Sequence, residues 1–252
     1  MKKVFLVLSL LAALVWIAAP VLAVQDEIPK KSDAAALKIV EKMIEAQGGR
    51  KLLESIKDTT VTGTVEMVQF GVDGAVSIYN KEPNMMRLDI EVMGMVITQA
   101  FDGESAWMFN PQTGANEEMP EQMADEFKRE AMGSAYLLNP EKHNIVYVLK
   151  DPETLEGKEY LVLDQVHPDG WTATLWIDAE TFLSYKVKAM GLNQMGVEVE
   201  TETFTTDYKK VEGMMTAHTM TTYQDGEEFM TMTLTEIKLN TGIEDSFFKM
   251  DG

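Results

Sequence analysis

The histidines and serines of this chain form no familiar metal-binding or nucleophilic motif. His143, His167 and His218 are far apart and show neither His-x-His nor His-Glu-x-x-His spacing. We therefore expect surface or rim histidines rather than metal ligands. The Gly133-Ser134 pair falls inside a predicted helix and does not match the Gly-x-Ser-x-Gly turn that presents a serine nucleophile. The sequence thus indicates neither a metal site nor an activated serine.

Phosphate loops and carboxylate pairs give no stronger signal. The chain has no Gly-x-x-x-x-Gly-Lys, and no Gly-x-Gly-x-x-Gly follows a predicted strand. Glu198, Glu200 and Glu202 alternate along one strand, which is typical of a solvated face rather than of a glycosidase pair. We predict no enzyme activity, no cofactor and no metal, so ligand binding should be indifferent to chelators. A secreted hydrolase with a site assembled from distant residues remains an alternative hypothesis.

Composition narrows the class of protein further. The chain has no cysteine, which excludes a thiolate nucleophile, a cysteine metal site and a lipidated N-terminal cysteine. A net charge of −19 opposes binding to nucleic acid and to anionic lipid headgroups. Methionine is the outlier, with 19 of 252 residues. Flexible, polarizable methionines can mould to apolar ligands of variable shape, although any single one can simply fill the core.

The N-terminus has the pattern of an export signal. Two lysines follow Met1, an apolar run covers residues 4–19, and a proline precedes a small-x-small site ending at Ala23. We predict that residues 1–23 are a cleaved signal peptide. The mature protein, residues 24–252, would then be a single soluble domain in the periplasm. An uncleaved N-terminal anchor is the alternative.

In the rest of the chain, apolar residues recur either at helical spacing or at every second residue. Apolar residues at helical spacing predict helices over 33–47, around Leu52 to Ile56, and over 120–138. From residue 59 to residue 239, apolar and polar residues alternate in about a dozen short segments separated by turns. Strands this numerous must close, pair as a sandwich or curl around something. The composition and pattern are typical of a container for an apolar ligand.

One predicted strand separates its two faces clearly. Its wet face carries Arg87, Asp89 and Glu91. Its apolar face carries Met86, Leu88, Ile90 and Val92. Period-2 geometry brings the four apolar side chains together, and Met95 and Ile97 continue this surface on the next strand.

A motif in the same region carries a resemblance. Lys81-Glu82-Pro83-Asn84, then Asp102-Gly103, Trp107 and Asn110-Pro111, resemble the K-x-P-N and D-G-x-x-x-W-x-x-N-P pattern of LolA-like outer-membrane lipoprotein-sorting proteins. The segment ending in Phe247-Phe248 resembles their closing strands. In the classical carrier an arginine that latches the lid commonly precedes the proline, and here Glu82 takes that position.

The resemblance implies a mainly β (α+β) fold: a strongly curved antiparallel sheet, an incomplete barrel of about 11–12 strands, with helices covering its concave face. It implies a non-enzymatic periplasmic carrier that binds acyl chains of lipoproteins or other lipids, works with membrane-bound donor and acceptor proteins, and is a monomer. A periplasmic lipid-sensing module that acts through a protein partner is the alternative. The expected cavity residues are Met86, Leu88, Ile90, Val92, Met95, Ile97, Trp107, Phe127 and Ala131.

Overall fold

The computed structural model describes residues 29–193 and 195–250. The predicted signal peptide, residues 1–23, lies outside the described residues. Within those two ranges, no helix combines the length and apolarity needed to cross a lipid bilayer.

The described residues form fourteen strands in one antiparallel sheet. In chain order the strands are β1 (Asp58–Met67), β2 (Val72–Lys81), β3 (Met85–Val92), β4 (Met95–Phe101), β5 (Ala106–Asn110), β6 (Ala115–Glu118), β7 (Val146–Leu149), β8 (Glu153–Leu155), β9 (Lys158–Val166), β10 (Thr172–Asp178), β11 (Ser184–Leu192), β12 (Glu198–Val211), β13 (Met214–Gln224) and β14 (Glu227–Leu239). The sheet adds β6 and β8 to the strands expected from the sequence. These segments lack apolar alternation and are held by pairing with β5 and β9.

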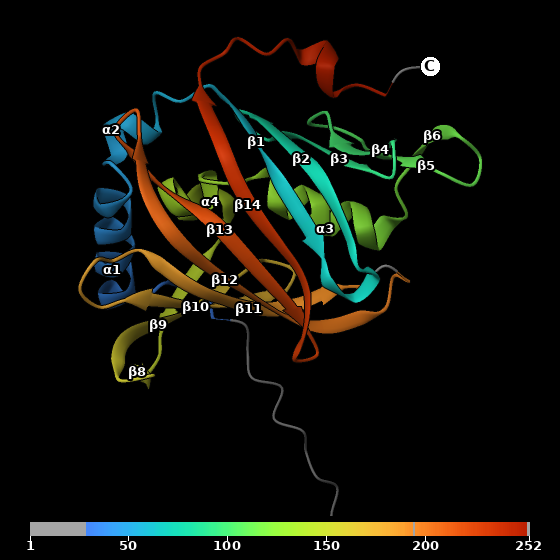
Figure 1. Cartoon of the computed structure of the whole chain (residues 1–252). Helices are drawn as coiled ribbons and strands as arrows, with labels where there is room; N and C mark the ends of the chain where they lie inside the picture. The colour runs from blue at the N-terminus through green and yellow to red at the C-terminus, as the bar shows by residue number, and fades with distance from the viewer. Residues whose placement is uncertain (1–28, 194, 251–252) are drawn as a thin grey trace, which may run out of the picture.

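The sheet is curved and open. Its strand order is β6-β5-β4-β3-β2-β1-β14-β13-β12-β11-β10-β9-β7, and β8 pairs with β9. The first strand therefore pairs with the last, and the end strands β6 and β7 are not paired with each other in the described part of the chain. A register shift between Thr62 and Gly63, where β1 pairs with β14, adds a local bend. The sheet wraps around α3 and α4 (Figure 1), which confirms the predicted incomplete barrel.

In residues 29–193 and 195–250, four α-helices and three short 3₁₀ helices accompany the sheet. They are α1 (Ala34–Ala46), α2 (Arg50–Leu53), α3 (Glu121–Ala131), α4 (Ala135–Leu138), η1 (Val68–Phe70), η2 (Pro140–His143) and η3 (Asp245–Phe248). The predicted helix over 120–138 is two helices. Gly133 has a φ of 45°, in the left-handed region that a continuous right-handed helix excludes, so the chain breaks between α3 and α4.

Two helical covers lie on the sheet. The first joins α1 to the end of the sheet formed by β7, β9 and β10. Its buried residues are Ala36, Val40, Met43, Ile44, Leu53, Leu138, Ile145, Tyr147, Leu163 and Ile177. The second joins α3 to the opposite limb, β3 to β5. Its buried residues are Met86, Phe101, Ala106, Met119, Ala124, Phe127 and Ala131. The strands between the two limbs form the floor of the concave face.

The C-terminal segment covers the other, convex face of β2 to β5. Phe248 is fully buried, and its carbonyl accepts a hydrogen bond of 2.8 Å from Trp107 Nε1. Arg87 donates to the Phe247 carbonyl at 3.1 Å and lies 4.5 Å from the Phe247 ring. The face of β3 that carries Arg87 and Asp89, expected to be wet, is therefore largely covered. Both side chains are only about one-fifth exposed, and they pair with each other at 3.0 Å.

Candidate functional site

The floor of the concave face carries a cluster of methionines. Cross-strand register places Met67 opposite Met230 and Met232 opposite Met220. Directly opposite residues of an antiparallel pair share a face of the sheet. We call Met67, Met220, Met230 and Met232 the methionine patch. All four are half-buried, although methionine at a core position would be fully covered.

The methionine patch belongs to the same face as the residues under α3. Val61 on β1 lies opposite Ile78 on β2, and Ile78 lies opposite Leu88 on β3. Ile78 packs against both the cluster under α3 and the cluster that includes Met220. One continuous apolar surface therefore runs from α3 across β3, β2 and β1 to β14 and β13.

The helix α3 spans the opening of the curved sheet. Its apolar side, Ala124, Phe127 and Ala131, is buried against β3 to β5. On another side of the helix, the Glu126 carboxylate accepts from the backbone N–H of Leu192 on β11 at 3.2 Å and 3.3 Å. This helix thus bridges two strands that are far apart in the sheet order, as a lid would.

Glycine at position 191 permits this close approach. A Cβ atom there would lie 2.8 Å from Glu126 Oε1 and 2.9 Å from Thr201 Oγ1. Neither distance is compatible with an ordinary carbon contact, so a larger residue would displace the Glu126 carboxylate, which bonds to Leu192, or the Thr201 side chain. Gly191→Ala would therefore loosen the lid at its β11 side.

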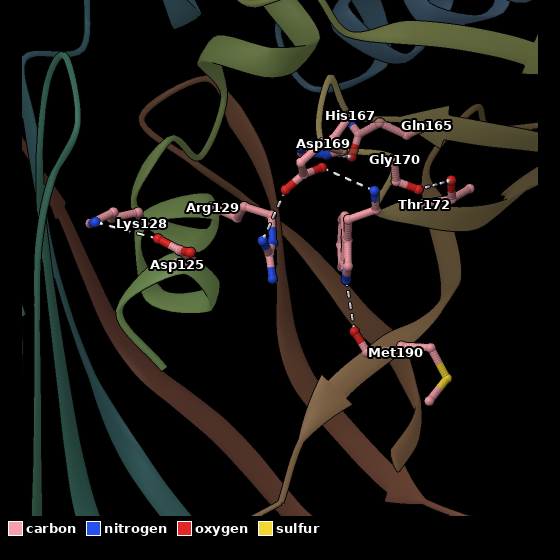
Figure 2. A network of polar contacts seen from close by, with 10 residues as sticks. Asp125, Lys128, Arg129, Gln165, His167, Asp169, Gly170, Thr172 and Met190 are labelled. Carbon is pink, nitrogen blue, oxygen red and sulfur yellow. Dashed lines mark hydrogen bonds and ion pairs between the residues drawn. The ribbon is translucent and has the colours of Figure 1, made fainter. Parts of the chain in front are cut away.

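A polar network holds the outer side of the lid (Figure 2). Arg129 on α3 pairs with Asp169 of the β9–β10 turn at 3.4 Å and lies 4.8 Å from the Trp171 ring. The indole Nε1 of Trp171 donates to the Met190 carbonyl on β11 at 2.7 Å. Cation–π and ion-pair contacts of this kind contribute on the order of 1 kcal/mol each when partly exposed. The lid is therefore fastened by several weak contacts.

Two carboxyl groups on α3 have raised pKa values. Burial raises the pKa of Glu126. The Glu130 side chain is reached by solvent, yet desolvation by the surrounding protein and repulsion from Glu126 raise its pKa to about 7. Because both groups are one turn apart, their ionised forms repel each other. The closed lid therefore favours the protonated carboxyls.

We expect the lid to close more tightly at lower pH. A carboxyl whose pKa is raised in the folded state binds more protons there than in the open chain, so stability falls as pH rises from about 4.5 to about 7. Amide hydrogen exchange in α3, corrected for its intrinsic pH dependence, should be slower at about pH 5 than at about pH 8. Glu130→Gln should flatten this difference. The matched change Glu121→Gln, at the exposed start of α3, should not; an unchanged pH dependence in Glu130→Gln would contradict the assignment.

Two clefts border the helical covers rather than the methionine patch. The first, about 330 Å³, lies between α3 and β11 and is mixed in polarity. It is lined by Gln122, Asp125, Glu126, Arg129, Asp169, Trp171, Met190, Gly191, Leu192 and Glu198. The second, about 200 Å³, lies between α2, α4 and the β2–β3 turn and includes Glu82 and His143. In this closed arrangement, neither cleft offers an acyl chain a dry apolar lining.

Six of the nine expected cavity residues lie on the concave face of the sheet, and Phe127 and Ala131 lie on α3, which packs against that face. Met86 and Leu88 pack in the same cluster as Phe127 and Ala131 of α3. The other four share their face by register. They are Ile90, Val92, Met95 and Ile97, with Ile90 opposite Ile97 and Val92 opposite Met95.

Trp107 does not lie with them. It is opposite Ala100 on β4, and Ala100 is opposite Arg87 on β3, so all three point to the convex face. There Trp107 is 3% exposed and bonded to the Phe248 carbonyl. The cavity role expected for Trp107 is wrong, because the C-terminal segment buries the convex side of β5.

Trp107→Phe should separate stability from binding. The change removes a buried hydrogen bond and leaves the Phe248 carbonyl without its donor, which costs about 1–3 kcal/mol of unfolding free energy. Because the ring lies on the far side of the sheet, the affinity for an acyl probe should not change. A denaturant melt measured beside a probe titration checks both. A large loss of affinity with unchanged stability would return Trp107 to the cavity.

The histidines were also placed incorrectly from the sequence. His167 and His218 are buried, with 3% and 7% exposure, rather than on the surface. His167 packs edge-on between Tyr136 and Trp171 at 4.8 Å from each ring centroid, and burial lowers its pKa. Among the described residues, no three histidine, aspartate or glutamate side chains are grouped as metal ligands.

Comparison with known proteins identifies the chain. A model of a family described as uncharacterized proteins matches residues 91–251, more than half of the sequence. The chain belongs to this family. No curated protein sequence matches it.

The solved structures that this family member resembles share the LolA-like fold. A LolA superfamily protein from Nitrosomonas europaea matches with a TM-score of 0.58 and 15% identity, covering 85% of this chain and 97% of that one. A domain described as outer membrane lipoprotein-sorting, from Vibrio parahaemolyticus, matches at 0.57 and 15%, covering 85% and 96%. A DUF1329 family protein from Desulfovibrio piger matches at 0.58 and 12%, covering 87% and 98%. The fold suggested by the sequence motif is confirmed.

In this LolA-like fold, Glu82 contacts the region of the lid. The Ser134 hydroxyl, between α3 and α4, donates to Glu82 Oε1 at 3.5 Å. Burial raises the pKa of Glu82, against opposing effects of this hydrogen bond and of Lys57. The position where the classical carrier commonly has arginine therefore contacts the connection between α3 and α4 here, through a weak hydrogen bond.

The sequence prediction missed the methionine patch. Its signal was present, since Met230 and Met232 alternate with threonines along one strand. However, only the register with β1 and β13 brings Met67 and Met220 beside them.

Proposed function

We propose that this protein is a non-enzymatic periplasmic carrier that binds acyl chains of lipoproteins or other lipids on its concave face. The observation that carries the proposal is the methionine patch: four half-buried methionines on an apolar surface that is continuous with the face under α3. The LolA-like fold supports it, because relatives of that fold include a protein described as lipoprotein-sorting.

The energetics suit reversible carriage. Each acyl CH₂ removed from water contributes about 0.8 kcal/mol, so one long chain supplies ample affinity without any covalent step. Methionine side chains adapt to chains of different length and unsaturation. The polar lid contacts contribute only about 1 kcal/mol each, so movement of α3 during loading and release is opposed mainly by its apolar packing.

The proposal is tested on protein recovered from the periplasm of its own host. Intact mass should show cleavage after Ala23, and native mass spectrometry should show co-purified lipid. Delipidated protein should bind a fluorescent fatty acid with one saturable site. Protein that carries no lipid and binds no fatty acid would overturn the carrier function, and a stoichiometric protein partner without lipid would favour the sensing alternative.

A further inference from the structure

One end of the sheet differs sharply from the other in polarity. Because the strands are antiparallel, the turns β1–β2, β3–β4, β5–β6, β9–β10, β11–β12 and β13–β14 all lie at the same end. The registers Met67 to Met230, Gln224 to Thr201 and Ala189 to Ala173 fix this placement across the whole sheet. The β1–β2 and β13–β14 turns lie toward the lower part of the view in Figure 1.

This end collects the exposed apolar side chains. Of the ten large apolar residues that are exposed in the described part of the chain, eight lie in or beside three of its turns. We call these eight residues the apolar rim: Val68, Phe70, Met93, Met95, Val96, Met190, Met195 and Val197. Met93 and Met195, at turn tips, are 81% and 83% exposed. Solvent exposure of this many large apolar groups at one end points to a binding surface.

The same turns lack charge. Residues 67–72, 92–101 and 189–197 contain no Asp, Glu, Lys or Arg, although a quarter of the chain is charged. The turns at the opposite end carry acidic residues instead. They include Glu82, Asp102, Glu104, Glu180 and Glu212. The three uncharged turns are therefore suited to less polar surroundings than the turns at the opposite end.

The apolar rim is continuous with the candidate binding face. Met67 of the methionine patch is followed directly by Val68 and the rest of the β1–β2 turn. Met95 belongs to both surfaces, since it lies opposite Val92 on the concave side of the sheet and is half exposed. From Met67 through the β1–β2 turn, residues 67–72, the sequence carries no charged side chain.

We propose that the apolar rim docks on the surface of a zwitterionic phospholipid bilayer. A protein partner would have to bury one continuous apolar patch, and interface cores are depleted of charge. Here the acidic β13–β14 turn, with Asp225 and Glu227, divides the rim. Separate turn tips can instead enter between lipid molecules while flanking carboxylates stay at headgroup level.

Charge selects the kind of lipid. Asp73, Glu91 and Glu198 flank the three uncharged turns, and the whole chain carries a net charge of −19. Anionic headgroups would repel this end, whereas a zwitterionic headgroup has no net charge to repel it. The docking places the rim end of the sheet against the lipid bilayer, which holds the proposed acyl-chain cargo.

Vesicle flotation tests the docking, and it needs no cargo. The mature chain should float with vesicles of phosphatidylethanolamine and phosphatidylcholine, and less with vesicles that contain phosphatidylglycerol. The combined changes Phe70→Ser, Met93→Ser and Met195→Ser should lower partitioning by roughly tenfold or more, because three apolar side chains no longer leave water. The control, Leu149→Ser with Met250→Ser, alters the two exposed apolar residues outside the rim and should leave partitioning unchanged.

The role of the docking rests on the proposed carrier function, and binding of a fluorescent fatty acid tests that function separately from flotation. The rim variant should keep its fatty-acid affinity. Failure of the wild type to float, equal flotation of the rim variant, equal loss in the control, or a preference for anionic vesicles would overturn the docking. The docking would also be overturned if the wild type and the control formed a concentration-dependent oligomer and the rim variant did not. The rim would then be an interface between copies of the chain.

Discussion

Met232→Glu should weaken binding of a fluorescent fatty acid by on the order of a hundredfold or more, which corresponds to about 2.7 kcal/mol. Met232 lies between Val65 on β1 and Met220 on β13, in the middle of the methionine patch. A carboxylate there would have to lose its hydration against an acyl chain with no partner, which is costly. In the unliganded protein the side chain is half-buried, so the carboxylate can stay hydrated and the fold should survive.

The matched control is Thr233→Glu, one residue along the same strand. Thr233 is exposed on the opposite face, so the same charge should leave the affinity unchanged. A probe titration and a thermal melt are measured for both variants. A folded Met232→Glu protein with wild-type affinity would show that the methionine patch does not bind the chain, and the carrier proposal would lose its main support.

Phe127→Ala should release the lid. Phe127 is 6% exposed and packs with Met86, Phe101 and Ala106. Truncating a buried phenylalanine costs about 3–5 kcal/mol, which exceeds the contribution of the Arg129 ion pair or cation–π contact that also fastens α3. We expect a fall in melting temperature on the order of 10 °C if α3 unfolds with the rest of the domain. If α3 detaches alone, its amides should exchange much faster while those of β12 and β13 stay protected.

Phe70→Ala is the matched control, because Phe70 is 53% exposed in the β1–β2 turn. The same truncation there should change neither stability nor exchange in α3. Unaltered exchange in α3 of the Phe127→Ala variant would mean that the helix is held mainly by Arg129 and Glu126, contrary to the packing argument.

The alternation of apolar and polar residues predicted most strands, because a strand's two faces are set by residues that are neighbours in the sequence. Alternation of Met86, Leu88 and Ile90 with charged residues requires a strand with two unlike faces, and β3 has them. The long strands β12 to β14 followed from the same period. The short strands β6 and β8 could not be predicted, since their few residues carry no period and form strands only beside β5 and β9.

The candidate site was predictable in part. The face under α3 followed from alternation in one strand, and the helical spacing of Phe127 and Ala131 indicated the helix that covers it. Trp107 shows the limit: β5 reads Ala-Trp-Met-Phe-Asn and is apolar on both faces. The neighbouring residues do not indicate which face of β5 lies inside the curved sheet. The position of Trp107 depends on its contact with Phe248, which is 141 residues away.

The sequence by itself determined the composition of the surfaces: period-2 strands, an amphipathic lid helix, abundant methionine, and turns without charge. Only the tertiary structure decided which of these meet. Pairing of β1 with β14 brings Met67 to Met230, and antiparallel register gathers three uncharged turns at one end of the sheet. The physical reason is that backbone hydrogen bonds set strand neighbours and register between residues far apart in the chain, whereas hydrophobic period fixes only the faces of each strand.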